Sequence, residues 1–179
     1  MTQITLAVTG SISAYKAADI TSQLTKLGFE VKVLMTPSAQ KFITPLTLQV
    51  LSKNPVGLEV MVEDDPQRIE HIDIGKETDL FLVAPASANT IAKLAMGLAD
   101  NMVTSTALAL PQNTKKLLAP AMNTKMLEHP ATQRNLKLLQ DYGYQIIQPR
   151  DAVLACGDKG SGALATIEAI VEAVKENCL

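Results

Sequence analysis

Apolar residues gather in short runs along the chain, and each run is followed by a break and then by helical spacing. Residues 4–8 have the pattern of a buried strand, Gly10 to Ser13 interrupt it, and residues 14–27 have the periodicity of a helix. Gly28 ends that helix, and a second apolar run follows at 29–35. The pattern predicts that strands and helices alternate.

Later parts of the chain repeat this order. The runs at 79–84, 115–119 and 144–148 are short and mainly apolar, and a helix with one apolar stripe is expected at 166–176. Strands that are apolar on both faces are typical of a parallel sheet covered by helices. We therefore expect one α/β domain over residues 1–179, a doubly wound Rossmann- or flavodoxin-like parallel sheet of about five or six strands with helices on both faces.

The composition argues against several classes of partner. Apolar residues make up 47% of the chain and charged residues 19%, and the net charge of −2 offers no basic surface for nucleic acid. No apolar run reaches the about 20 residues that a membrane-spanning helix needs, and the N-terminus lacks a signal-peptide pattern. We expect a cytoplasmic protein that binds neither nucleic acid nor a membrane. Cys156 and Cys178 lie far apart in the sequence, so no metal site is expected.

Small and polar residues follow three of the predicted strands. They are Gly10, Ser11, Ile12 and Ser13 after the first strand, Thr36, Pro37 and Ser38 after the second, and Pro85, Ala86, Ser87, Ala88, Asn89 and Thr90 after the third. Taken singly, each turn is explained as the capped start of a helix. Taken together, three such strand ends favour a mononucleotide pocket, because helix N-termini there present free amides and a positive dipole.

Three further places carry reactive or polar groups. His71 begins a segment of alternating polarity, where a lone histidine is usually a surface or edge residue, yet it is the best general acid or base in the chain. Asn123 follows the fourth strand and could bind a carboxylate through its NH2 group or simply cap a helix. Residues 155–162 combine Cys156 with three glycines, which predicts a mobile loop able to close over a substrate, or a long turn with a chance cysteine.

Taken in order, these residues resemble the homo-oligomeric flavin-containing cysteine decarboxylases. The segments that carry the resemblance cover almost the whole chain: 10–12, 71–73, 85–90, 99–101, 120–126 and 155–158. The Ser-Ala-Asn-Thr stretch is shared with relatives, Pro-x-Met-Asn-x-x-Met is more specific to cysteine decarboxylation, and Ala-Cys-Gly-Asp is the sharpest discriminator. Leu127 and Leu164 depart from the family pattern, which usually has tryptophan at the first position and methionine near the second.

The resemblance implies a bound flavin mononucleotide (FMN) and roles for particular residues. The residues that would contact FMN are Gly10, Ser11, Ile12, Ser13, Thr36, Ser38, Ser87, Ala88, Asn89, Thr90 and Ala121. The three catalytic residues it implies are His71 as the acid or base beside the flavin, Asn123 as the group that binds the substrate carboxylate, and Cys156 as a proton donor. Met126, Lys76, Ala155 and Gly157 would be further substrate-binding residues.

The same resemblance implies the reaction and the partners. Phosphopantothenoylcysteine would lose its carboxylate after oxidation of its thiol to a thioaldehyde, and the enethiol would then be reduced to 4'-phosphopantetheine for coenzyme A biosynthesis. A homo-oligomer, trimer or dodecamer, is implied, and the absence of a further segment after the closing helix implies a separate phosphopantothenate-cysteine ligase.

Four alternatives stay open at this point. A peptidyl-cysteine decarboxylase is not expected to have the Ala-Cys-Gly-Asp segment, and Asn123 with Met126 argues against a flavin prenyltransferase. A non-catalytic flavin-binding regulatory subunit would not need His71, Asn123 and Cys156 together. A flavodoxin-like electron carrier is weakened by the aromatic content of 3%, since carriers often stack the flavin between rings.

Overall fold

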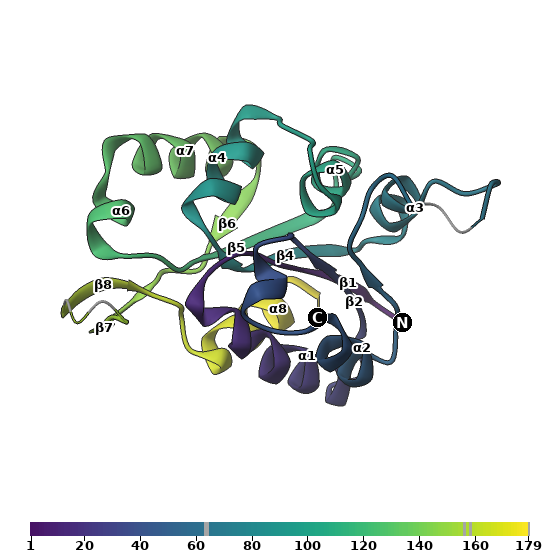
Figure 1. Cartoon of the computed structure of the whole chain (residues 1–179), viewed down its shortest axis with the longest axis horizontal. Coiled ribbons are helices and arrows are strands. Elements are labelled where there is room, and N and C mark those ends of the chain that lie inside the picture. The colour runs from purple at the N-terminus through teal and green to yellow at the C-terminus, as the bar shows by residue number, and fades with distance from the viewer. Residues whose placement is uncertain (63–64, 156, 158, 179) are drawn as a thin grey trace.

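One parallel sheet runs through the protein (Figure 1). The computed structural model describes residues 1–62, 65–155, 157 and 159–178. In this described part, six strands follow the spatial order β3-β2-β1-β4-β5-β6, and every pair of neighbours is parallel. The strands are β1 (Gln3–Val8), β2 (Glu30–Met35), β3 (Val56–Gly57), β4 (Leu80–Ala86), β5 (Lys115–Pro120) and β6 (Tyr144–Ile146). The predicted doubly wound parallel sheet is confirmed.

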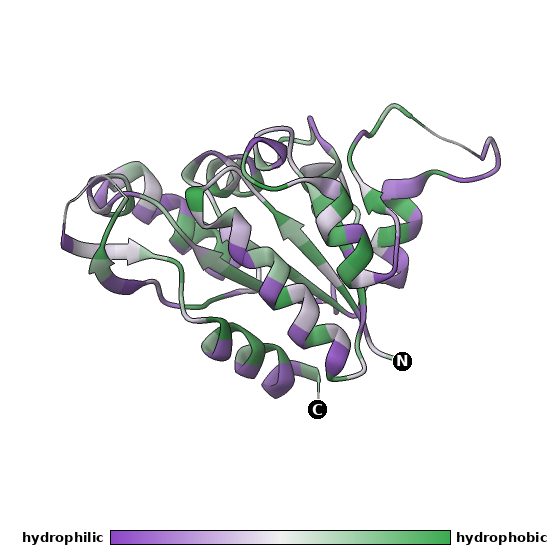
Figure 2. Cartoon of the chain, turned by 60° about the horizontal axis from the view of Figure 1, so that its bottom comes forward, coloured by the Kyte–Doolittle hydropathy of each residue, from purple (hydrophilic) through white to green (hydrophobic). Residues whose placement is uncertain are grey.

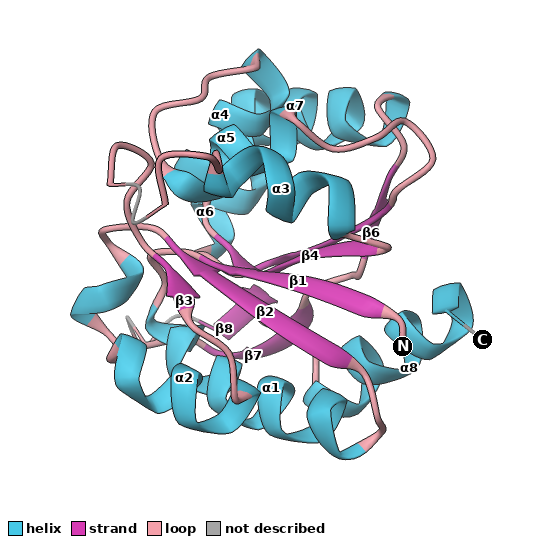
Figure 3. Ribbon diagram, turned by 90° about the vertical axis from the view of Figure 1, so that its right-hand side faces the viewer, coloured by secondary structure: helices cyan, strands magenta, loops and turns pink. Residues whose placement is uncertain are grey.

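Helices cover both faces of this sheet (Figure 3). One face carries α1 (Ala17–Lys26), α2 (Pro45–Ser52) and α8 (Ile167–Cys178), and the other carries α3 (Glu70–Glu77), α4 (Ala88–Met96), α5 (Met102–Leu108) and α7 (Pro130–Asp141). The short helices η1 (Ile12–Lys16), η2 (Ala39–Lys41) and α6 (Thr124–Glu128) each follow a strand end. Within the described residues, no helix combines the length and the apolar character needed to cross a membrane.

Two buried clusters, one on each face of the sheet, form the core. Leu6 and Leu82 belong to the cluster under α1 and α8, while Phe81 and Val83 belong to the cluster under α4 and α5. Successive side chains of a strand point to opposite faces, and here both faces are covered. This explains why the strands are continuous apolar runs in the sequence, and Figure 2 shows the polar sides of the helices facing outward.

The glycine-rich segment near the C-terminus differs from its prediction. The sequence predicts a loop over 155–162, whereas β8 (Lys159–Ala163) pairs antiparallel with β7 (Arg150–Val153) in a hairpin outside the main sheet. Glycine usually weakens a strand, but at Gly160 and Gly162 its missing side chain permits close packing against residues 122–124. A tertiary contact, and not local propensity, explains this strand.

The segment that begins at His71 is helical. Its alternating polarity does not indicate a helix, but the residues form α3. Ile74 and Gly75 are buried, and a side chain at Gly75 would lie 3.1 Å from the carbonyl oxygen of Ala109. The helix can therefore pack closely on the end of α5, and four alternating residues were too few to distinguish strand from helix.

Candidate active site

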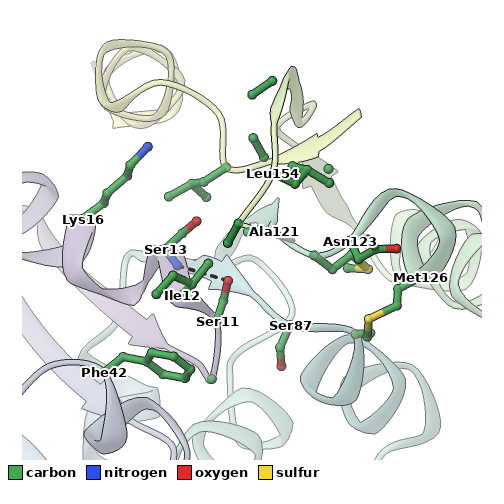
Figure 4. A pocket seen from close by; sticks show the side chains of 18 of the residues that line it. Ser11, Ile12, Ser13, Lys16, Phe42, Ser87, Ala121, Asn123, Met126 and Leu154 are labelled. Atoms are coloured by element: carbon green, nitrogen blue, oxygen red, sulfur yellow. Dashed lines mark hydrogen bonds between the residues drawn. The ribbon is translucent and has the colours of Figure 1, made fainter. Parts of the chain in front are cut away.

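A hollow of about 470 Å³ opens at the carboxyl edge of the sheet, between η1 and the β7–β8 hairpin (Figure 4). Loops after β1, β4 and β5 and both hairpin strands contribute to its wall. The lining includes Gly10, Ser11, Ile12, Ser13, Lys16, Phe42, Ser87, Ala88, Ala121, Met122, Asn123, Met126, Arg150, Leu154, Ala155 and Gly162. This edge is where open α/β sheets bind their ligands.

A second hollow of about 300 Å³ adjoins the first. Both hollows are lined by Gly10, Ser87, Ala88 and Met126, so they are parts of one larger concavity. The second hollow adds Thr36, Pro37, Ser38, Asn89, Thr90, Lys93, Asp100 and Asn101. Every residue predicted to contact the cofactor lines one hollow or the other.

The turn after β1 is shaped by a close approach between two loops. A methyl group at Gly10 would lie 2.5 Å from the Cβ atom of Ser38, so only glycine lets the first and second strand ends approach this closely. Ser11 caps η1, and its hydroxyl accepts the N–H of Ser13 at 3.3 Å. The capping interpretation of this turn is thus correct, and the capped helix start still faces the hollow.

Thr9 joins this turn to the loop after β4. Its buried hydroxyl donates to the carbonyl oxygen of Pro85 at 2.6 Å and accepts the N–H of Ser87 at 2.8 Å. Sequence reasoning missed this residue, because a threonine at a strand end carries no signal of its partner.

The loop after β4 leads directly into α4, whose N-terminus lies at the concavity. Ser87 is the N-cap, and its hydroxyl accepts the N–H of Thr90 at 3.2 Å. Ala88 has only a methyl side chain and Thr90 is buried, so the backbone at this helix start is accessible to a ligand. The positive end of the helix dipole favours an anion at this place.

Asn123 caps a helix and lines the larger hollow at the same time. Its Oδ1 atom accepts the N–H of Lys125 at 2.9 Å, which is the capping role that the sequence allowed. Met126, one turn along α6, lies beside it at the hollow (Figure 4). The cap uses the acceptor end of the amide, whereas binding a carboxylate would use the NH2 end.

Two cationic residues line the larger hollow, and sequence reasoning missed both. Lys16 projects from the end of η1, and Arg150 begins β7 and donates from Nε to the carbonyl oxygen of Leu164 at 3.1 Å. Neither cation forms an ion pair with an acid of the described residues, and no acid lines this hollow there. The sequence could have indicated Lys16 as a site residue, because it lies on the short helix that begins at the Gly10 turn.

His71 and Lys76 lie outside the two adjoining hollows of the site. His71 is half-buried in the first turn of α3, and its Nδ1 atom is buried without a hydrogen-bond partner among the described residues. Lys76 is exposed, lies 3.9 Å from Asp73, and lines a polar hollow at the opposite edge of the sheet. A single chain therefore does not bring these two residues to Asn123.

The predicted lid residues are only partly placed. Ala155 lines the larger hollow, and Gly157 has a positive φ of 88° and donates its N–H to the carbonyl oxygen of Leu154 at 2.8 Å. Cys156 lies outside the described residues. Leu127 and Leu164, the two residues that depart from the family pattern, are both buried.

Comparisons with known proteins place these features in a family. The flavoprotein family model matches residues 1–179. A Streptococcus mutans protein named "probable phosphopantothenoylcysteine decarboxylase" is 64% identical over 174 residues, which are 97% of either protein. The coenzyme A biosynthesis bifunctional protein of Bacillus subtilis is 45% identical over 97% of this chain, but the chain spans only 42% of that protein.

Solved structures agree with the sequence relatives. A PPC decarboxylase variant with a cysteine replaced by serine, complexed with pantothenoylaminoethenethiol, has a TM-score of 0.90 and 31% identity, covering 98% of this chain and 97% of that one. A peptidyl-cysteine decarboxylase has a TM-score of 0.80 and 28% identity, covering 98% and 99%. The fold and the site are those of a flavin-binding α/β protein. The chain belongs to the flavoprotein family, in the group that contains the phosphopantothenoylcysteine decarboxylases.

Proposed function

We propose that this protein is an FMN-dependent carboxy-lyase that converts phosphopantothenoylcysteine to 4'-phosphopantetheine in coenzyme A biosynthesis. The observation that carries the proposal is the single concavity where the Gly10, Ser38 and Ser87 loops meet Asn123 and the β7–β8 hairpin. The identity of 64% to the Streptococcus mutans protein favours this substrate over a peptide.

The residues of the concavity fit FMN. Close approach at Gly10 and the small side chain of Ala88 leave room beside backbone amides, and Ser38 and the α4 N-terminus offer donors to a phosphate. The volumes of about 470 Å³ and 300 Å³ lie in the range of cofactor sites. Ile12 and Ala121 supply apolar surface to the larger hollow.

The chemistry needs an electron acceptor, because a cysteine carboxylate cannot lose CO2 without a place for the electron pair. When bound, FMN supplies this by accepting two electrons from the CH2–SH group and returning them after CO2 has left. The NH2 group of Asn123 binds the substrate carboxylate, His71 moves a proton at the reacting carbon or thiol, and Cys156 donates the last proton. The net change replaces the carboxylate by a proton, with no net oxidation.

The two cations of the larger hollow suit the phosphate of this substrate. A phosphate monoester carries nearly two negative charges at neutral pH, and Lys16 and Arg150 form no ion pair with the acids that the structure describes. Ser11 and Ser13, on the same side as Lys16, offer further donors. A peptide substrate would give these cations no equivalent partner.

We propose that the active enzyme is a homo-oligomer, a trimer or a dodecamer, with each site at a boundary between subunits. His71 and Lys76 do not line their own chain's concavity, and a neighbouring copy is the source that can supply them. The enzyme would work in the cytoplasm, which keeps a thiol such as Cys156 reduced, and a separate ligase would provide its substrate.

The direct test is to purify the protein, record its visible spectrum and follow CO2 after adding phosphopantothenoylcysteine. A yellow protein that releases CO2 supports the proposal, and a protein that takes up no flavin on reconstitution contradicts it. Cys156→Ser is expected to release CO2 but to accumulate the enethiol. Normal 4'-phosphopantetheine output from that variant would remove Cys156 from the mechanism.

A further inference from the structure

Two hydrogen bonds connect the hairpin to the residues on either side of Asn123. The N–H of Met122 donates to the carbonyl oxygen of Gly162 at 2.9 Å, and the hydroxyl of Thr124 donates to the carbonyl oxygen of Ser161 at 2.6 Å. The first bond uses the backbone, so every residue type can make it. The second depends on the side chain of Thr124.

The two glycines of β8 make this contact possible. A methyl group at Gly160 would lie 2.7 Å from the hydroxyl oxygen of Thr124, and one at Gly162 would collide with the carbonyl oxygen of Met122. Gly162 also has a φ of 135°, a conformation that other residues rarely adopt. The backbone of β8 therefore lies directly against residues 122–124.

The other hairpin strand depends on β8 for its position near the site. β7 pairs with β8 from Arg150 opposite Ala163 to Val153 opposite Lys159, and Arg150 also bonds the carbonyl oxygen of Leu164. In the described residues, the hydrogen bonds that join the hairpin to the Asn123 segment are made by β8. The bonds of Met122 and Thr124 thus help to fix both strands relative to Asn123.

We propose that Thr124 is a positioning residue that fixes the β7–β8 hairpin relative to Asn123. The inference rests on the proposed function and adds a residue that the predicted site did not include. In the sequence, Cys156 falls between the two strands of the hairpin. The two groups that act directly on the reacting part of the substrate before CO2 leaves, His71 and Asn123, lie outside the hairpin. Thr124 therefore governs the return of the last proton more than the loss of CO2 from bound substrate.

If the hairpin is no longer held in place relative to Asn123, the product of the reaction changes. The saturated thiol has two more electrons and two more protons than the enethiol, so each enethiol released leaves these with the enzyme. In aerated buffer dioxygen takes them and becomes hydrogen peroxide. A Thr124 variant should therefore release enethiol and peroxide in equal amounts, while CO2 release at saturating substrate stays close to that of the wild type.

The experiment compares Thr124→Val, Thr124→Ala and Thr124→Ser with a matched control, Thr114→Val. Thr114 is a buried threonine whose hydroxyl donates to the carbonyl oxygen of Thr78 at 3.4 Å, at the opposite edge of the sheet. Hydrogen–deuterium exchange of the proteins as purified reports on the hairpin, and the ratio of enethiol to CO2 reports on the chemistry. Thr124→Ala serves if Thr124→Val does not fold.

Amide exchange over 150–164 should rise by about tenfold in Thr124→Val and Thr124→Ala, with β4 unchanged, because one hydrogen bond of the hairpin is lost. The enethiol fraction should rise with it, and Thr124→Ser and Thr114→Val should behave like the wild type. Unchanged exchange, or faster exchange with an unchanged enethiol fraction, overturns the inference. Wild-type protein that releases no CO2 overturns the proposed function and, with it, the expected effect of Thr124 on the product, while the exchange over the hairpin still tests its positioning role.

Discussion

The hydroxyl of Thr9 accepts the backbone N–H of Ser87 at 2.8 Å, which ties the end of β1 to the cap of α4. The same hydroxyl donates to the carbonyl oxygen of Pro85 at 2.6 Å. Thr9 is buried, so water cannot replace either bond. The spacing between the Gly10 turn and the α4 N-terminus, the two places expected to contact FMN, thus depends on one side chain.

Thr9→Val should loosen this connection. Leaving the N–H of Ser87 without its acceptor costs about 1–3 kcal/mol in the free energy of unfolding, and the FMN dissociation constant should rise by about tenfold. Denaturant unfolding and flavin fluorescence titration measure the two effects.

Thr5→Val is the matched control for Thr9→Val. The hydroxyl of Thr5 is buried in the first half of β1, where it shares a hydrogen bond of 2.7 Å with Thr78. This variant should lose stability but bind FMN like the wild type. Equal FMN affinities for both variants would show that Thr9 stabilises the fold without shaping the site.

Lys16→Gln and Arg150→Gln should each weaken use of the phosphorylated substrate. A charged hydrogen bond contributes about 1.5–3 kcal/mol, so kcat/KM for phosphopantothenoylcysteine should fall by roughly 10- to 100-fold. The value for pantothenoylcysteine, which lacks the phosphate, should not fall. Lys26→Gln, at the distant end of α1, is the control for the loss of one positive charge. Equal losses on both substrates would assign the cations to another role.

His71 and Asn123 should complement each other between subunits. His71→Asn alone should bind flavin but lose about 10²–10⁴-fold in rate, and Asn123→Asp alone should also be inactive. In randomly mixed oligomers, about one quarter of sites at a two-subunit boundary would combine an intact His71 with an intact Asn123. Co-expressed variants should therefore regain about a quarter of the activity. No recovery in verified mixed oligomers would mean that both residues act from one chain.

Much of the fold could be predicted from the sequence, because the local pattern of apolar and polar residues follows directly from which faces of a strand or helix are buried. The continuous apolar runs are strands buried on both faces, and the predicted sheet of five or six strands is the six-stranded sheet of the structure. The polar strand ends were also predictable, since the carboxyl ends of parallel strands lie at one edge.

The remaining features depend on contacts that the local pattern does not contain. The strand at 159–163 exists because glycines pack against residues 122–124, and α3 forms where Gly75 meets Ala109. The sequence does not show that Lys16 and Arg150 line the same hollow, because this follows only from the positions of η1 and β7 in the fold. The spacing of residues in the sequence also could not predict that His71 lies away from the two hollows of the site in its own chain.

Asp100 and Lys93 form an ion pair at the smaller hollow. The hydrogen bond from Lys93 holds the pKa of Asp100 below its ordinary value of 3.8, although the carboxylate is exposed. A carboxyl group whose pKa is lower in the folded state stabilises the fold above its unfolded pKa, and this contribution disappears as the pH falls through the folded pKa. Because the pair is exposed, the effect should be small and should shrink in high salt.

Asp100→Asn should therefore lower the free energy of unfolding at neutral pH, and the difference from the wild type should vanish in acid. The difference should be constant from pH 7 down to the ordinary pKa of aspartate and decline below it, as urea unfolding at a series of pH values would measure. Lys93→Gln should produce the same pH profile, and adding Asp100→Asn to it should cause no further loss. A wild-type advantage that persists at the lowest pH, or full additivity of the two changes, would show that the pair does not act through the charge of Asp100.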